Sequence, residues 1–408
     1  MVRECLPAAE SGRAQAGRVA LLYVAQFLAI GLSMPLLPIW LSARGLGAEA
    51  IGQILAAQSL ARTIGQPLLA RLADRTGQLR LVMLACTALA TAAAAWLGGF
   101  AVGFWALLLG VAATWFLFSP IVPLSEVLAV RIVERTGVPY GRMRLWGSLA
   151  FTLGAMIAGT LMDLWPADAL IWAVVAAQAL TMLSLFVQPA ELMRPATKKH
   201  ENADEYAEET EGWASLLTPG FMLFLLVSSL IQASHAMLYG FAALHWKSLG
   251  HSGTTVGLLV TAGVLAEVLL FWFSGHVVAR LGAVRLLLLA ALAATLRWAG
   301  MAFDPPLAAL YALQLLHAFS FGAAHLGAIA FIRTRAPAHL AATAQALNSS
   351  LSMGLFMMAA MWASGLLYAR FGAHAWAAMA AMTALATPLA LWLRRLMPAE
   401  RPLPARST

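Results

Sequence analysis

Apolar runs of about 20 residues or longer recur along this chain, and short polar turns separate them. A helix of that length crosses a hydrocarbon core roughly 30 Å thick. The pattern therefore predicts an all-α integral membrane protein with about twelve transmembrane helices. The predicted spans are 18–41, 48–70, 80–98, 103–131, 141–163, 168–188, 218–245, 253–279, 284–302, 306–335, 339–369 and 373–395.

One polar segment interrupts this rhythm. Residues 189–217 are rich in Glu, Asp and Lys, and such a composition is typical of a solvated linker. The linker divides the chain into residues 1–188 and residues 218–408. We therefore predict two pseudo-symmetric six-helix bundles joined by an acidic linker.

The two predicted bundles repeat one another in sequence. When the first half is aligned on the second, glycines and charged residues coincide around the same loop and within the same span. The coinciding pairs are Gly52 with Gly257, Arg62 with Glu267, Arg75 with Arg280, Gly77 with Gly282, and Arg80 with Arg285. Parallel repeats of this kind are typical of transporters whose site lies between the repeats.

The distribution of charge along the chain predicts its orientation. Lys and Arg number 26 against 18 Asp and Glu, which gives a formal net charge of +8. If the N-terminus is cytoplasmic, only Arg44, Lys247 and Arg370 fall in outer loops. This positive-inside pattern places both termini and the linker in the cytoplasm. The charge therefore reflects orientation in a lipid bilayer, and we expect no nucleic-acid partner.

The sequence lacks the features that an enzyme or a metalloprotein needs. Cys5 lies in the polar N-terminal tail and Cys86 in a span, which does not suit a disulfide framework. The polar start, Met1 to Gly17, indicates that no cleavable signal peptide is present. We find no cluster with metal-ligand spacing, no nucleotide-binding loop and no nucleophile–base pair. We therefore expect no metal, no cofactor and no enzymatic activity.

Five charged residues lie inside the predicted spans. They are Arg62, Glu126, Arg144, Glu267 and Arg297. Each costs at least about 2.5 kcal/mol if it faces hydrocarbon, so such residues face a protein interior or a water-filled path and pair with something. A chain that keeps five of them is better explained as a transporter than as a passive membrane protein.

Depth in the membrane brings some of these groups together. Arg62, Glu267 and Arg297 each lie roughly 18 Å from the cytoplasmic end of a span, at a rise of about 1.5 Å per residue. His317 lies about 16 Å below the outer surface by the same rise. These groups therefore gather near the midplane, where transporters built from repeats bind their cargo.

The midplane charges do not balance. Glu267 can neutralise only one of the cations Arg62 and Arg297, and an anionic cargo would neutralise the other through the bidentate fork of a guanidinium. For Arg62, cargo contact and a scaffold role are equally supported. For Arg297 we favour pairing with Glu267, although it is also a candidate substrate-binding residue.

Glu267 is the candidate proton carrier. A cargo that competes for the neighbouring Arg would change the surroundings of the carboxyl and so couple its protonation to binding. The alternative is a permanent ion pair. His317 is the candidate relay, because histidine titrates near physiological pH, and His325 lies two turns further along the same helical face. A buried neutral His317 is the competing interpretation, and His235 is a weaker candidate than either.

Two further pairs of residues complete the candidate site. Glu126 and Arg144 lie nearer the cytoplasmic ends of their spans, and we expect them to pair as a gate or scaffold, with cargo binding as the alternative. Tyr239 and Trp298 lie near the charged residues and could stack on a phenyl ring. Packing between helices explains these two aromatic residues equally well.

The loop at residues 70–80 resembles the loop between helices 2 and 3 of the major facilitator superfamily. Asp74, Arg75, Gly77 and Arg80 match the pattern Gly-x-x-x-Asp-Arg-x-Gly-Arg-Arg, whereas Ala70 and Gln78 depart from it. The resemblance implies the major facilitator fold. It also implies that Asp74 and Arg75 belong to a cytoplasmic latch.

A closer resemblance extends over nearly the whole chain. Segments 118–126, 140–148 and 232–240 resemble the phenylpropionate permease branch of the superfamily. This resemblance implies a symporter in the bacterial inner membrane that imports a proton with a small aromatic carboxylic acid such as 3-phenylpropionate. Glu126 with the glycines and arginines of 141–147 also resembles lactose permease, whose acid in helix 8 and Arg in helix 9 support the role of Glu267.

Other functions remain open at this point. An exporter of drugs or metabolites has the same fold, but segment 141–159 lacks the Gly-Pro-rich pattern of many proton-driven antiporters. A sugar or nucleoside symporter is a second alternative. We expect a monomer whose partners are a small organic anion and a proton.

Overall fold

The computed structural model describes residues 12–189, 193 and 216–397, and within these ranges the chain is almost entirely helical. The first half begins with a long helix that contains two prolines, Pro35 and Pro38. Its helices are α1 (Gly12–Ala43), α2 (Ala48–Thr76), α3 (Leu79–Gly99), α4 (Phe104–Phe118), α5 (Ile121–Thr136), α6 (Tyr140–Leu164), η1 (Ala167–Ala169) and α7 (Ile171–Phe186).

The second half contains more interrupted helices. Two short stretches, η2 and η4, have π-helical hydrogen bonding, which is rare and often found at functional sites. The helices are α9 (Pro219–Ala233), α10 (Ala236–Ser248), α11 (Gly253–Trp272), α12 (Ser274–Met301), α13 (Leu307–Leu315), η2 (Ala318–Gly322), α14 (Ala323–Arg335), η3 (Ala338–Leu340), α15 (Ala341–Ser349), η4 (Ser350–Phe356), α16 (Met357–Phe371), η5 (Gly372–Ala375) and α17 (Trp376–Leu396).

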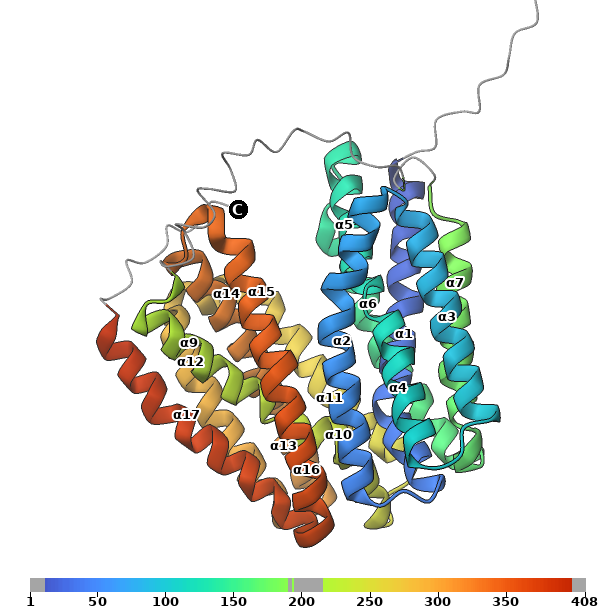
Figure 1. Ribbon diagram of the computed structural model, residues 1–408. Helices are drawn as coiled ribbons and strands as arrows, with labels where there is room; N and C mark the ends of the chain where they lie inside the picture. Colours follow the sequence, from blue (N-terminus) through green and yellow to red (C-terminus); the bar gives the residue numbers. More distant parts are fainter. Residues whose placement is uncertain (1–11, 190–192, 194–215, 398–408) are drawn as a thin grey trace, which may run out of the picture.

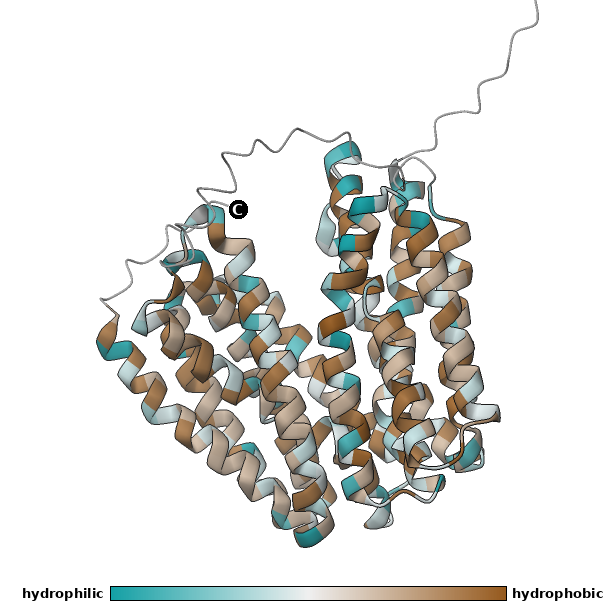
Figure 2. Cartoon of the chain, viewed as in Figure 1, coloured by the Kyte–Doolittle hydropathy of each residue, from teal (hydrophilic) through white to brown (hydrophobic). Residues whose placement is uncertain are grey.

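These helices confirm the predicted all-α membrane architecture. Ten helical runs within the described residues are long and apolar enough to cross a membrane. Apolar residues cover much of their length in Figure 2. Helix α2 is not among the ten runs, and the run Ala341–Leu396 contains both α16 and α17, which the turn η5 joins. The total of twelve spans stays a prediction.

The helices form two groups, α1 to α7 and α9 to α17, which we call the N-terminal and C-terminal bundles (Figure 1). They pack together mainly through α2 against α16 and α6 against α11. The predicted bundle boundaries, residues 1–188 and 218–408, stay a prediction. Most of the predicted linker 189–217 lies outside the described residues.

The repeated glycines have matching structural roles. Gly77 ends α2 with a φ of 65°, and its counterpart Gly282 breaks the course of α12 with a φ of 70°. Residues with a side chain rarely adopt such positive φ values, so glycine suits both positions. The sequence repeat therefore corresponds to a glycine of positive φ at the matching point of each half.

A second pair of repeated glycines lies where the bundles touch. A Cβ atom on Gly52 of α2 would lie 2.6 Å from the Cα of Gly365 in α16. On the other side of the interface, a Cβ on Gly257 of α11 would lie 2.7 Å from the carbonyl oxygen of Ala155 in α6. Only glycine permits backbones to approach this closely. Both contacts lie at the end of the molecule where α2 begins and α6 ends (Figure 1).

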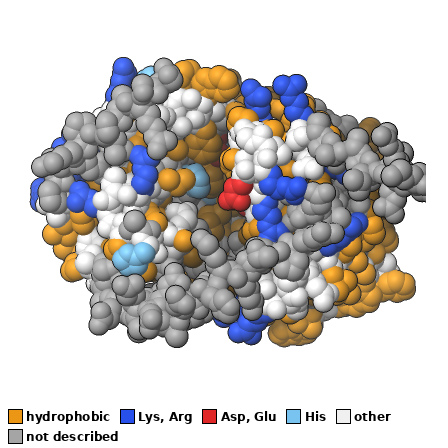
Figure 3. All heavy atoms as spheres, turned by 90° about the horizontal axis from the view of Figure 1, so that it is seen from above, with side chains coloured by type: hydrophobic (Ala, Val, Ile, Leu, Met, Phe, Trp, Pro, Cys, Tyr) orange, Lys and Arg blue, Asp and Glu red, His pale blue; other side chains and the backbone are white. Residues whose placement is uncertain are grey.

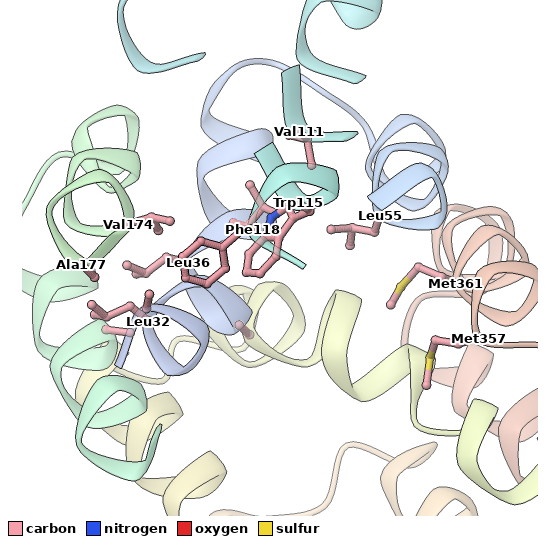
Figure 4. Close-up of a cluster of buried hydrophobic side chains, with 14 of the residues drawn as sticks. Leu32, Leu36, Leu55, Val111, Trp115, Phe118, Val174, Ala177, Met357 and Met361 are labelled. Atoms are coloured by element: carbon pink, nitrogen blue, oxygen red, sulfur yellow. The ribbon is translucent and has the colours of Figure 1, made fainter. Parts of the chain in front are cut away.

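The apolar core continues from one bundle into the other at this end. Trp115 and Phe118 of α4 pack inside the N-terminal bundle, and Leu55 of α2 and Met361 of α16 belong to the same buried cluster (Figure 4). At the other end the molecule is hollowed between the bundles, as Figure 3 shows. The structure is therefore closed at the end where α2 begins and open at the end where α2 finishes.

Candidate functional site

The C-terminal bundle brings three of the predicted midplane residues together. Arg297 lies on α12, Glu267 on α11, and His317 just before the π-helical turn η2. Arg297 is completely buried, whereas Glu267 keeps 16% of its side chain exposed. Burial without water requires partners for a charged group, and the structure supplies them from neighbouring helices.

Three side chains hold the Arg297 guanidinium. Its Nη2 donates to Oε1 of Gln314 at 2.6 Å, and its Nη1 donates to Oγ of Ser320 at 3.1 Å. Nη1 also lies 2.9 Å from Nδ1 of His317. The guanidinium carbon lies 4.6 Å from the centre of the Trp298 ring, which adds a cation–π contact.

His317 stands between the two charged residues that we expected to pair directly. Its Nε2 lies 3.2 Å from Oε2 of Glu267, and its Nδ1 faces Arg297 on the other side. Within the described residues no ion pair joins Arg297 to Glu267. The direct pair is therefore wrong for this conformation, because an imidazole occupies the space between the guanidinium and the carboxyl.

Gln314 and Ser320 are partners that the sequence analysis did not identify. Each lies three residues from His317, one before and one after, so all three project from similar faces of one helical run. A search for polar residues at that spacing around His317 would have found them. Neither is charged, which is why an inventory of ionisable groups missed both.

The aromatic candidates occupy different surroundings. Trp298 is completely buried, donates from Nε1 to Oγ of Ser234 at 2.9 Å and stacks on Trp376. In this conformation it supports Arg297. Tyr239 is half-buried beside the ring of His235, with 6.0 Å between ring centres. A stacking role for either residue on a cargo stays a prediction.

His317 and His325 share one helical face, as their spacing predicts. The half-buried ring of Phe321 lies between them and stacks on both, at ring-centre distances of 5.2 Å and 6.3 Å. Phe271 of α11 also contacts the ring of His325. These aromatic and imidazole rings therefore form a series of contacts that ends beside Glu267.

Arg62 differs from the other membrane arginines. It lies in the middle of α2, its side chain is exposed, and its guanidinium carbon lies 5.7 Å from the centre of the Trp115 ring. Within the described residues it forms no hydrogen bond and no ion pair. Arg62 is thus an accessible cation without a counter-charge in that part of the chain.

The face of α2 that carries Arg62 turns towards the C-terminal bundle. Leu55 lies two turns earlier on the same face and approaches Gly240 of α10. The side chain of the next residue, Thr63, lies 2.7 Å from the position that a Cβ on Gly354 of η4 would take. Arg62 therefore lies on the side of α2 that faces the other bundle.

Glu126 and Arg144 come together in the N-terminal bundle. Oε1 of Glu126 lies 3.7 Å from Nε of Arg144, and Tyr140 donates its hydroxyl hydrogen to Oε2 at 2.6 Å. The Arg144 guanidinium lies over the rings of Phe27 and Tyr23 on α1. Both charged side chains are about one third exposed. Their role as a gate, scaffold or cargo site stays a prediction.

The loop motif is exposed at the open end. Asp74 and Arg75 have no hydrogen-bond or ion-pair partner within the described residues, and Arg80 donates to the carbonyl oxygen of Phe186 at 3.1 Å. The predicted latch is therefore not engaged in this conformation. Among the described residues no group of three or more His, Cys, Asp or Glu could hold a metal ion.

The MFS_1-like family matches residues 17–378, which is most of the chain. The chain belongs to this family. It is therefore a transporter of the major facilitator superfamily and not an enzyme.

Relatives of this MFS transporter have known or assigned cargoes. It is 32% identical over 356 residues to the probable 3-phenylpropionic acid transporter of Escherichia coli (strain K12), covering 87% of this chain and 91% of the relative. It is 31% identical over 348 residues to the maltose permease of Geobacillus stearothermophilus, covering 82% and 83%. The first relative agrees with the predicted phenylpropionate branch.

Solved structures show the same fold at low sequence identity. The nucleoside transporter NupG superposes with a TM-score of 0.79 at 15% identity, over 95% of this chain and all of the other. A bacterial homologue of the human lysosomal transporter Spinster, in an inward-facing and unoccupied conformation, superposes with a TM-score of 0.72 at 13% identity, over 95% and 98%. These matches establish the fold of this MFS transporter.

Proposed function

We propose that this MFS transporter is a monomer that imports a small aromatic carboxylic acid together with a proton, by alternating access. The observation that carries the proposal is the state of its membrane arginines. Arg144 lies beside Glu126, and Arg297 is held by Gln314, Ser320 and His317. Among the residues that the structure describes, Arg62 has no such partner, and it is exposed on the face of α2 towards the other bundle.

An unpaired, accessible guanidinium at mid-membrane favours an anionic cargo. A carboxylate accepts two parallel hydrogen bonds from its planar fork, and the attraction is strong where water is scarce. Half-buried Tyr239 and Phe321 supply ring surface near Glu267 that suits an apolar aromatic body. Arginine, ring surface and a titratable acid together fit a carboxylic acid whose other end is aromatic.

Proton coupling is assigned to Glu267. Its carboxyl lies 3.2 Å from Nε2 of His317 and remains partly exposed, so a proton can reach it. His317 connects it to the permanent charge of Arg297. A change in the protonation of Glu267 therefore alters the contacts that join the helices α11, α12 and α13.

The proposal is tested by uptake of labelled 3-phenylpropionate into proteoliposomes. We expect accumulation only when an inward proton gradient is imposed, with competition by unlabelled phenylpropionate and little competition by the corresponding amide, which lacks the carboxylate. Accumulation that ignores the proton gradient would refute the coupling. Extrusion from loaded vesicles under an inward proton gradient would favour an exporter.

A sugar symporter is the second candidate, because the maltose permease and the raffinose permease of Escherichia coli are among the relatives. Uptake of labelled maltose or raffinose into the same vesicles distinguishes the sugar symporter from the acid symporter. Proton-driven maltose uptake without phenylpropionate uptake would establish the sugar function. A neutral sugar would leave Arg62 without a counter-charge, which is why we favour the acid.

A further inference from the structure

A series of hydrogen bonds runs from the backbone of α9 to His317, whose ring lies within ion-pair distance of the carboxyl of Glu267. It passes through His235, Ser320 and Arg297 to His317, and all four side chains are buried. Ring nitrogens and hydroxyls can donate or accept, so geometry alone does not say where the hydrogens lie. Two groups at this site can act only as donor or only as acceptor, and they determine where the hydrogens of the other groups lie.

The first of these is Arg297, whose guanidinium can only donate. Its Nη1 lies 2.9 Å from Nδ1 of His317, so Nδ1 must accept and carry no hydrogen. The ring hydrogen of a neutral His317 then lies on Nε2, which is 3.2 Å from Oε2 of Glu267. His317 is therefore neutral in this arrangement and presents an N–H to the carboxyl.

The second is the backbone of α9, whose carbonyl oxygens can only accept. Nδ1 of His235 lies 3.1 Å from the carbonyl oxygen of Ile231 and 3.3 Å from that of Gln232, so Nδ1 carries the hydrogen. Nε2 of His235 must then accept. The hydroxyl of Ser320 lies 3.3 Å from it and is the donor within reach.

Ser320 joins the two determined ends. Its oxygen accepts from Arg297 at 3.1 Å, and its hydrogen goes to His235. The alternative acceptor, the carbonyl oxygen of His317 in the same helical run, is further away at 3.5 Å. Every hydrogen in the series thus has one place, and the two histidines hold opposite tautomers.

We infer that His235 and Ser320 are positioning residues for the proton site at Glu267. They act through Arg297: Ser320 orients Nη1, and His235 fixes the direction in which Ser320 donates. Arg297 in turn keeps His317 in the tautomer that faces Glu267. The inference rests on the proposed proton coupling, but the tautomers can be measured without any cargo.

Other ionisable groups also surround this series. Tyr239 of α10 lies beside His235 and acts electrostatically on Glu267. His325 of α14 and Arg144 of α6 also act electrostatically on Glu267. Any pH profile reports these groups together, so removal of the Ser320 hydroxyl is the cleaner perturbation because it adds no charge and removes none.

The transport test compares Ser320→Ala with Ser320→Thr, which keeps a hydroxyl. We expect Ser320→Ala to lower proton-driven accumulation about tenfold, the factor for losing one hydrogen bond to a charged group, with cargo exchange nearly unchanged. Ser320→Thr should restore accumulation. Ser33→Ala is the matched control, since that buried hydroxyl donates only to the Ile30 carbonyl in its own helix.

A double-mutant cycle tests whether His235 and Ser320 act as one unit. If they do, the variant with both His235→Leu and Ser320→Ala should accumulate about as much cargo as the worse single variant. A separate packing role for each residue predicts that the two losses multiply. Multiplied losses, or equal losses of accumulation and exchange in Ser320→Ala, would overturn the inference.

Nitrogen-15 NMR of histidine-labelled protein in lipid nanodiscs reads the tautomers directly. We expect the His317 signal to report a hydrogen on Nε2 and the His235 signal to report one on Nδ1, each assigned by its loss in the His→Gln variant. Ser320→Ala should leave His235 without its donor and change its signal. Opposite tautomers would overturn the inference even if transport is proton-coupled, and the expected tautomers without proton-coupled transport would refute only the proposed function.

Discussion

The carboxylate of Asp163, at the end of α6, caps the first turn of α11 through Thr254. Its Oδ2 accepts from the backbone N–H of Thr254 at 2.8 Å and from the hydroxyl of the same residue at 2.9 Å. Its Oδ1 accepts from the N–H of Gly253 at 2.6 Å, and Lys247 lies 3.4 Å away. One carboxylate of the N-terminal bundle thus satisfies several donors of the C-terminal bundle.

This contact is the counterpart of the disengaged loop motif. Asp163 lies at the closed end, where the glycine pairs allow the backbones to touch, whereas Asp74 is exposed at the open end. A negative charge at a helix N-terminus is favourable because it meets unpaired N–H groups and the positive end of the helix dipole. Opening of the closed end must break all of these bonds.

We predict that Asp163→Asn favours the conformation opened at that end. The amide keeps the size of the side chain but loses its charge, which weakens the charge-assisted hydrogen bonds. We therefore expect the equilibrium between the closed and open conformations to shift about tenfold towards the open one. The measurement is maleimide labelling of a cysteine placed at Ser364, which is completely buried beside Gly365. Labelling should be faster, and Asp168→Asn, an exposed carboxylate nearby, should leave the rate unchanged.

The close contact between glycines predicts that a larger side chain at Gly52 also opens this end of the molecule. In Gly52→Leu the new side chain meets the Gly365 backbone, from which even a Cβ would lie only 2.6 Å. We expect loss of uptake with faster labelling at position 364 and a folded protein by size-exclusion chromatography. Gly17→Ala is the control, because nothing lies within 4 Å of its Cβ position. Unchanged labelling in Gly52→Leu would contradict the closed-end assignment.

We predict that substitution of Arg62 changes the affinity for the cargo and not the folding of the protein. Arg62→Lys keeps the charge but loses the planar fork, and we expect binding of 3-phenylpropionate to weaken about tenfold, with Arg62→Ala weaker still. Scintillation proximity binding measures this on purified protein. Arg71→Lys, on an exposed part of the same helix, serves as the control. Wild-type affinity in Arg62→Ala would exclude the cargo contact.

We predict that a substitution at Glu267 separates cargo exchange from proton-driven accumulation of cargo. Gln imitates the protonated acid, so Glu267→Gln should bind cargo and exchange it across the membrane but fail to accumulate it against a gradient. A purely structural Glu267 predicts poor folding instead, partly restored by also neutralising Arg297, since a lone buried charge is the costly state. The matched control is Glu49→Gln at the first turn of α2. Proton-driven accumulation at the wild-type rate in Glu267→Gln rules out the carrier role.

Hydropathy and composition alone determined the membrane class, the places of most helices and the charged residues within them. These properties follow from the chain's local order, because a span needs only enough consecutive apolar residues to cover the hydrocarbon core. The repeat also came from sequence: Gly77 and Gly282 adopt the same positive φ, and Gly52 and Gly257 both lie where backbones touch.

Only the tertiary structure decided which groups meet. Depth along a helix placed Arg297, Glu267 and His317 at one level, but the rotation of each helix about its axis and the π-helical turn after His317 put the imidazole between the two charges. The uncharged partners Gln314 and Ser320, and the cap that Asp163 forms on α11, depend on the same packing. Hydropathy reports whether a residue lies in the membrane, whereas hydrogen bonds between helices depend on which faces turn towards each other.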